Sequence, residues 1–149
     1  MKTEKSAGAI IFYLENNEPF FLLLKYTNYW GFVKGNIEAG EEKDIFGTVT
    51  RESKEEANLD DLRFLPKFKF EQQWFYTFKG ERISKTAIFF LAEVSLENVK
   101  NTKISFEHED FKWLNFEDAI KLLKIKSNKD MLTRAKEFIA ESSKQKTLF

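Results

Sequence analysis

The sequence predicts an α/β or α+β sandwich in which a mixed β-sheet lies between helices. Apolar and aromatic runs typical of strands stand on both sides of one central helical segment, and two further helical segments follow. The strand–helix alternation and the glycine-rich phosphate loops of doubly wound nucleotide folds are absent. With 149 residues and no repeat or linker, the chain is expected to form one domain over residues 1–149.

The N-terminal part of the chain predicts a pair of strands and a short extended segment. Lys5–Glu15 and Pro19–Tyr26 are rich in β-branched, aromatic and other apolar residues, and Asn16-Asn17 between them is a turn signal. Both runs are almost continuously apolar, which is typical of strands covered on two faces. Trp30–Lys34 is then predicted as a short strand or extended loop leading into Gly35.

The central helix is predicted over Ile45–Ala57. Asn36–Glu42 precedes it as a loop, and Asp44 stands at the N-cap position. Asn58 tolerates the left-handed conformation and is expected to end the helix.

The second half of the sheet is predicted from a hairpin and two edge segments. Phe70–Phe78 and Ile83–Val94 flank a Lys-Gly-Glu turn, the strongest hairpin signal in the chain. Lys103–Phe106 and Phe111–Leu114 are expected as short edge segments around the acidic loop 107–110.

Two helices are predicted at the C-terminal end. Asn115 is expected to cap the first, with Asp118 at the capping-box position. A polar break at Lys126–Lys129 separates it from a last helix, whose apolar stripe at helical spacing is expected to pack in the core. The tail 142–149 is predicted to be frayed.

Composition limits the chemistry that the chain can perform. Lys plus Arg and Asp plus Glu both number 24, so no basic field indicates general nucleic-acid binding. There is no cysteine and only one histidine, His108, which excludes disulfides, thiolate chemistry and multi-histidine zinc sites. A metal ion would therefore depend mainly on oxygen ligands.

No targeting or membrane-spanning segment is predicted. The first ten residues lack the apolar core of a signal peptide, and the run Pro19–Leu24 is far shorter than the ~20 residues of a spanning helix. We therefore expect a cytoplasmic protein without membrane attachment.

Three carboxylates on the central helix are the first functional signal. Glu52, Glu55 and Glu56 stand at i, i+3 and i+4 and so share one helix face. Their mutual repulsion would be relieved by a hard cation such as Mg²⁺ or Mn²⁺. A solvated acidic face is the alternative interpretation of these residues taken alone.

The spacing around these glutamates resembles the box motif of the Nudix hydrolases. Gly35, five residues and Glu41 fit the motif, as do Arg51-Glu52, Glu55-Glu56 and Leu59. Nine residues instead of seven separate Glu41 from Arg51, so that counting back from Arg51 places the box glutamate at Lys43; Ser53 and Asn58 replace the usual apolar residue and glycine. The resemblance implies an α/β/α sandwich that cleaves a nucleoside diphosphate linked to another group.

Segments outside the box resemble the diadenosine tetraphosphate hydrolase branch of that family. They are residues 30–35, 75–80 and 105–120. The resemblance implies that Glu52, Glu55 and Glu56, with the Gly35 carbonyl, bind Mg²⁺, or Mn²⁺ in its place. Arg51 stands at i, i+4 from Glu55, a spacing that lets it orient this carboxylate; an ordinary surface salt bridge is the alternative interpretation.

The remaining site residues are predicted from their positions in the chain and from the same resemblance. Glu55 and Glu107 are the two candidates for the general base, and Glu107 is alternatively a further metal ligand. Lys34 precedes the Gly35 turn and is expected to contact a phosphate, with a solvated surface lysine as the alternative. The resemblance implies that Tyr76 stacks on adenine, with a role in the core as the alternative. Ile125 stands where the branch has a second stacking tyrosine.

The functional hypothesis is a Mg²⁺-dependent pyrophosphohydrolase. Its nucleotide substrate would be a dinucleoside polyphosphate such as diadenosine tetraphosphate, cleaved to ATP and AMP by attack of a metal-activated water. Two alternatives stay open: hydrolysis of another nucleoside diphosphate derivative (an RNA 5′ end, a nucleotide sugar or a damaged nucleoside triphosphate), and a module that senses a nucleotide without cleaving it. The oligomeric state is left open.

Overall fold

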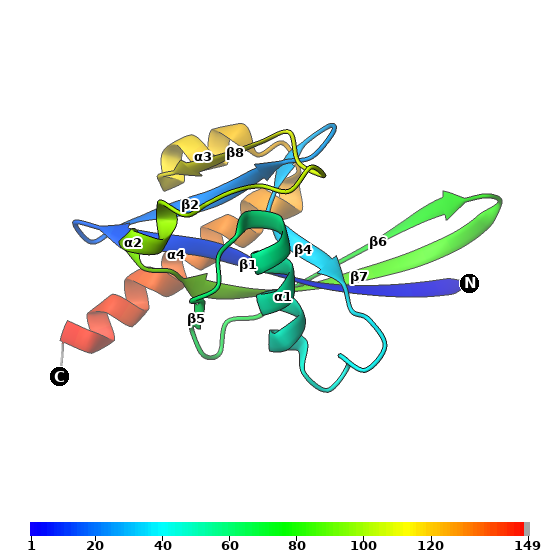
Figure 1. Ribbon diagram of the computed structural model, residues 1–149, viewed down its shortest axis with the longest axis horizontal. Coiled ribbons are helices and arrows are strands. Elements are labelled where there is room, and N and C mark those ends of the chain that lie inside the picture. The colour runs from blue at the N-terminus through cyan, green and yellow to red at the C-terminus, as the bar shows by residue number, and fades with distance from the viewer. Residues whose placement is uncertain (148–149) are drawn as a thin grey trace.

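The expected sandwich is observed: one mixed sheet lies between helices (Figure 1). The computed structural model describes residues 1–147, with side chains through residue 144. Within that range eight strands form one sheet. They are β1 (Lys2–Glu15), β2 (Glu18–Lys25), β3 (Trp30–Gly31), β4 (Val33–Asn36), β5 (Arg63–Phe64), β6 (Phe70–Phe78), β7 (Glu81–Glu93) and β8 (Asp110–Leu114).

The centre of the sheet is a parallel pair, β1 and β7, in register from Lys2 opposite Ile83 to Phe12 opposite Glu93. The other pairings are antiparallel: β2 and β4 pair with β1, β8 and β3 with β2, and β5 and β6 with β7. The hairpin of β6 and β7 extends beyond the body of the molecule together with the start of β1 (Figure 1). The long pairing with β7 accounts for β1 beginning three residues earlier than the apolar pattern predicts.

Helix α1 (Ile45–Ala57) covers one face of the sheet and has the predicted limits. The Asp44 side chain accepts a hydrogen bond from the Gly47 amide at 3.0 Å, and Asn58 adopts φ 60° at the C-cap. Val49 packs there with Ala9 and Ile11 of β1 in one apolar cluster. The caps and the apolar pattern therefore fix this helix as predicted from the sequence.

The opposite face is covered by α3 (Phe116–Leu122) and α4 (Lys126–Thr147). Asn115 caps α3 by accepting from the Asp118 amide at 2.9 Å, as predicted. Ile10 and Phe12 point to this face, alternating with the β1 residues that contact α1. None of the helices in residues 1–147 is long and apolar enough to cross a membrane.

Two local predictions are wrong. Lys126–Lys129 is the first turn of α4 and not a break, because the stripe that begins at Met131 is already in phase with this turn. Lys103–Phe106 forms no strand; its backbone instead hydrogen-bonds to the end of α1, and a short helix α2 (Leu96–Val99) precedes it. The tail 142–149 was predicted to be frayed; α4 includes its residues 142–147, and residues 148–149 lie outside the described range.

Candidate active site

The central feature of the site is a cavity of about 610 Å³ between α1, β4 and the loop before β8. Glu52, Glu55 and Glu56 of α1 line it together with Gly35 of β4. The charged lining is completed by Lys34, Glu38, Arg51, Lys85 and Glu107. Residues from five separate segments therefore meet here, and they include the box residues apart from Glu41 and Leu59.

Arg51 connects the carboxylates of the site. Its Nη1 atom lies 3.0 Å from Glu52 Oε1 and 3.2 Å from Glu55 Oε2. Its Nε and Nη2 atoms donate to the two carboxylate oxygens of Glu41 at 2.9 and 3.0 Å. The forked contact with Glu41 fixes the guanidinium plane, so that Nη1 can orient both Glu52 and Glu55.

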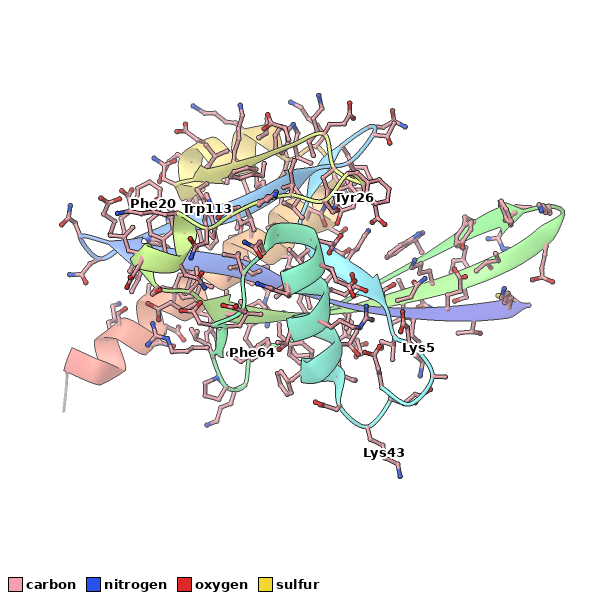
Figure 2. All side chains as sticks on the ribbon, in the orientation of Figure 1. Lys5, Phe20, Tyr26, Lys43, Phe64 and Trp113 are labelled. Carbon is pink, nitrogen blue, oxygen red and sulfur yellow. The ribbon has the colours of Figure 1, made fainter. Side chains whose placement is uncertain are left out.

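Glu41, and not Lys43, takes the place of the box glutamate beside Arg51. The hydrogen bonds from Arg51 lower the pKa of Glu41 to about 2. Lys43 is exposed and points away from the helix into solvent (Figure 2). The two additional residues are therefore accommodated in the loop before Asp44, and the contact between Glu41 and Arg51 is kept.

The backbone of Gly35 lies against the carboxylate of Glu52. A Cβ atom built on Gly35 would lie 1.9 Å from the carboxylate carbon of Glu52, so any side chain here would displace that carboxylate. Burial, followed by the charge of Glu56, raises the pKa of Glu52 to about 7. The glycine thus allows close approach of a carboxylate that is costly to ionise where it stands.

Glu56 is buried and held from two sides. Its Oε1 atom lies 2.8 Å from His108 Nε2, and its Oε2 atom accepts from the backbone amide of Lys34 at 3.1 Å. Burial raises the pKa of Glu56 despite these contacts. His108 packs edge-on against Tyr26, which lies beside the C-terminal end of α1 (Figure 2).

The loop before β8 brings Glu107 to the cavity. The Lys103 and Ser105 amides donate to the carbonyls of Ala57 and Glu56 at 3.1 and 3.2 Å, so the loop is attached to the end of α1. Glu107 is exposed and forms no hydrogen bond or ion pair with the described part of the chain. Phe106 beside it also lines the cavity and is 98% exposed.

The donors of the site suit a hard divalent ion, although they are not gathered around one point. Within residues 1–147 no three acidic or histidine side chains converge as a metal site, because Arg51 holds Glu52 and Glu55 while His108 holds Glu56. The donor set is carboxylate oxygen, and burial raises the pKa of Glu52 and Glu56 despite their contacts with Arg51 and His108. A divalent cation would compensate these charges.

A second cavity of about 500 Å³ adjoins the first at Lys34, which lines both. Its walls combine polar side chains with aromatic rings, among them Tyr29, Phe32, Trp74 and Phe89, and we call it the aromatic cavity. The Lys34 Nζ atom lies over the rings of Tyr29 and Trp74, 5.6 and 5.3 Å from their centres, and donates to the Tyr29 hydroxyl at 3.2 Å. Burial lowers the pKa of Lys34.

The structure separates Tyr76 from both cavities. Its hydroxyl donates to the carboxylate of Glu4, out on the projecting hairpin, and it does not line either cavity. Trp74, two residues earlier on the same strand face, lines the aromatic cavity instead, opposite Ile125. The period-two pattern of this strand could have indicated Trp74 as an alternative to Tyr76.

Four further residues at the site were not predicted from the sequence. Lys85 of β7 lines the acidic cavity, and its Nζ atom lies 3.4 Å from Asn36 Oδ1. Tyr29, Gln72 and Asn128 line the aromatic cavity. No local motif marks these residues, because strand pairing and helix packing bring them to the site.

Comparison with known proteins agrees with this geometry. A family model described as "NUDIX domain" matches residues 3–136. The chain is 31% identical over 139 residues to the asymmetrical bis(5'-nucleosyl)-tetraphosphatase of Caenorhabditis elegans, covering 91% of this chain and 96% of that protein. It is 32% identical over 146 residues to the protein of the same name from Sus scrofa, covering 91% and 95%.

Among solved structures, a binary complex of an Ap4A hydrolase from C. elegans matches with a TM-score of 0.77 and 29% identity, covering 93% of this chain and 98% of that one. The family model spans most of the chain and the box residues surround one cavity. The chain therefore belongs to the Nudix family.

Proposed function

We propose that the protein is a divalent-metal-dependent hydrolase of dinucleoside polyphosphates, with diadenosine tetraphosphate, cleaved to ATP and AMP, as its substrate. The observation that carries the proposal is the adjoining of an acidic cavity and an aromatic cavity at Lys34. The names of the two curated relatives and of the similar solved structure support the same substrate class.

The two cavities suit the two ends of a nucleotide. A base would occupy the aromatic cavity, where stacking on a ring is worth ~1–3 kcal/mol. Its phosphates would extend past Lys34 into the acidic cavity, where Lys34 and Lys85 are the cations placed to contact them.

Glu52, Glu55 and Glu56 would hold the metal, with the Gly35 carbonyl and Glu107 as further donors lining the same cavity. A bound Mg²⁺ or Mn²⁺ would screen the phosphate charge and favour ionisation of the attacking water. Arg51 positions Glu52 and Glu55 through the contacts described above.

Hydrolysis requires that a water oxygen bond to a phosphorus atom while the phosphoanhydride P–O bond breaks, and that a base accept the proton of the water. Glu55 and Glu107 are the candidates. The Glu55 side chain is 57% exposed and contacts Arg51, whereas Glu107 has no partner in the described part of the chain. Both line the cavity, so comparison of the two variants decides between them.

The exposed ring of Phe106, outside the aromatic cavity, favours a substrate with two nucleosides. Phe106 lies at the rim of the acidic cavity, in the loop that carries Glu107. An exposed phenylalanine is costly to keep in water and offers a stacking surface for the base outside the aromatic cavity.

A non-catalytic sensing module is disfavoured, because Glu52, Glu55 and Glu56 are all present and line one cavity.

The test is a chromatographic panel of substrates with a titration of Mg²⁺ and Mn²⁺. The panel holds diadenosine tetraphosphate, a triphosphorylated RNA 5′ end, a nucleotide sugar and a damaged nucleoside triphosphate. We expect the first to be cleaved fastest, and only with metal present. Cleavage of another member while diadenosine tetraphosphate is untouched would refute the substrate assignment.

Glu55→Gln and Glu107→Gln are compared on the same substrate. The general base should lose about 100-fold or more in turnover without loss of thermal stability. If neither variant loses turnover, both are removed from the proposed mechanism.

A further inference from the structure

A pair of amides, the half-buried Gln72 and the buried Asn128, forms one wall of the aromatic cavity. Gln72 of β6 and Asn128 of the first turn of α4 are 56 positions apart, and Gln72 Nε2 donates to Asn128 Oδ1 at 2.9 Å. Both residues line the cavity, and Asn128 is only 7% exposed. Among the described residues, Asn128 carries the most buried side-chain amide that lines either cavity.

The contact leaves the second polar atom of each amide without a partner among the described residues, one of them an acceptor and the other a donor. Gln72 Oε1 and Asn128 Nδ2 form no hydrogen bond with the described part of the chain, and neither atom is sealed from the cavity. Turning both amides over would exchange the two groups and still leave one donor and one acceptor. A buried amide with unused hydrogen-bonding groups is costly unless a ligand or water satisfies them.

The surroundings of this pair select a planar, aromatic, hydrogen-bonding ligand. Trp74 and Phe89 provide ring walls, and the cavity leads past Lys34 to the acidic site. Adenine carries a donor, the N6 amino group, beside an acceptor on each of its two polar edges. Bidentate pairing of a glutamine or asparagine amide with such an edge is a common mode of adenine recognition.

We propose that the Gln72–Asn128 pair reads the edge of the adenine base and so determines the base specificity of the enzyme. The inference rests on the proposed function, because it assigns the base of that nucleotide substrate to the aromatic cavity. The pair acts on binding and not on the bond that is cleaved, so it is tested by binding alone.

The experiment removes a hydrogen-bonding group from the nucleotide and, separately, from the protein. Binding of AMP is compared with binding of purine riboside 5′-monophosphate, which lacks the N6 amino group, by calorimetric titration of the wild-type protein and of Gln72→Met. The wild-type protein should bind AMP about 3- to 10-fold more tightly, as expected for one neutral hydrogen bond in a partly buried site. Gln72→Met should bind the two nucleotides equally.

Asn128→Ala provides an independent variant, and Gln73→Met is the matched control. Gln73 also lines the cavity, but its amide donates to Ser84 Oγ at 3.2 Å and makes no contact with the pair, so Gln73→Met should retain the preference for AMP. Thermal denaturation of each variant establishes that it is folded. If both Gln72→Met and Asn128→Ala fold and keep the wild-type preference, the pair serves only to join α4 to β6 and the proposal is overturned.

The outcome is distinguishable from failure of the proposed function. A protein that prefers AMP through this pair but cleaves no dinucleoside polyphosphate supports the inference on binding and refutes the hydrolase assignment. A protein that cleaves diadenosine tetraphosphate but shows no preference between the two monophosphates overturns the inference alone. Comparing 1-deaza- and 7-deaza-AMP then assigns the edge of the base, because only loss of the contacted nitrogen weakens binding.

Discussion

Gly35→Ala tests whether the position of the Glu52 carboxylate controls the chemistry. The new Cβ atom would lie 1.9 Å from the carboxylate carbon and 2.1 and 2.4 Å from its oxygens. An ordinary contact begins at 3.4 Å, so the carboxylate must move by about 1.5 Å, the difference between 3.4 and 1.9 Å. The moving group is the end of a flexible side chain, so the backbone need not shift.

Stability and activity should respond differently to this change. Gly35 has no positive φ, so alanine is compatible with its backbone and stabilises through the unfolded chain by about 0.4–1 kcal/mol. That gain offsets part of the loss of contact between Glu52 and Arg51, and we expect the melting temperature to change by about 2–4 °C at most. A displacement of about 1 Å or more in a reacting site can cost about 100-fold in rate, which is the fall in kcat/KM that we expect.

The assay is turnover of diadenosine tetraphosphate at saturating Mg²⁺, with thermal denaturation measured in parallel. A cycle with Glu52→Gln assigns the cause, because Gly35→Ala should add little once the carboxylate is gone. A folded Gly35→Ala variant with wild-type turnover would refute the reasoning. Fully additive losses in the cycle would show that the alanine acts elsewhere than through Glu52.

The remaining predictions concern the pH response, the box glutamate and the second base. Burial raises the pKa of Glu52 from its usual 4.5 to about 7, so the stability of the metal-free fold should fall as pH rises between these values. The dependence of melting temperature on pH should be weaker in Glu52→Gln. An unchanged dependence in this variant would contradict the assignment. Glu41→Gln releases Arg51 and should weaken apparent Mg²⁺ affinity about 10- to 100-fold in a metal titration, whereas Lys43→Ala should match the wild type. Phe106→Ala should lower kcat/KM for diadenosine tetraphosphate about 5-fold or more and leave adenosine tetraphosphate unaffected, since the latter has no second base; an equal loss on both would remove the stacking role.

The parts of the fold that local chemistry determines were predicted from the sequence. Helix α1 has the predicted limits because Asp44 and Asn58 cap it through contacts within a few residues of each end. The start of α4 was missed because Lys126–Lys129 is polar, although it lies in the same helix as the buried stripe beyond it. A polar first turn looks the same in sequence whether it belongs to a loop or to a solvated helix end.

Residues assembled by distant contacts could not be predicted in this way. Gln72 and Asn128 meet only because α4 packs across the sheet, and no motif relates β6 to a helix 56 positions later. For Tyr76 the strand was predicted correctly and Trp74 lies on the same face, but the sequence does not show where along that strand the cavity ends. The resemblance to the family placed the ring two residues further along the hairpin than the structure places the cavity.

The contact between Glu41 and Arg51 explains how the chain tolerates its insertion. A motif written as fixed spacing treats the two additional residues as a break, yet what the site needs is a carboxylate that meets the guanidinium of Arg51. A loop can gain residues at little entropic cost provided that its ends stay fixed, and here they are fixed by β4 and by the Asp44 cap. Glu41 further anchors its own loop, because its carboxylate accepts from the Glu38 amide at 2.9 Å. The condition that the chemistry imposes is therefore the geometry at Arg51 and not a fixed number of residues in the loop.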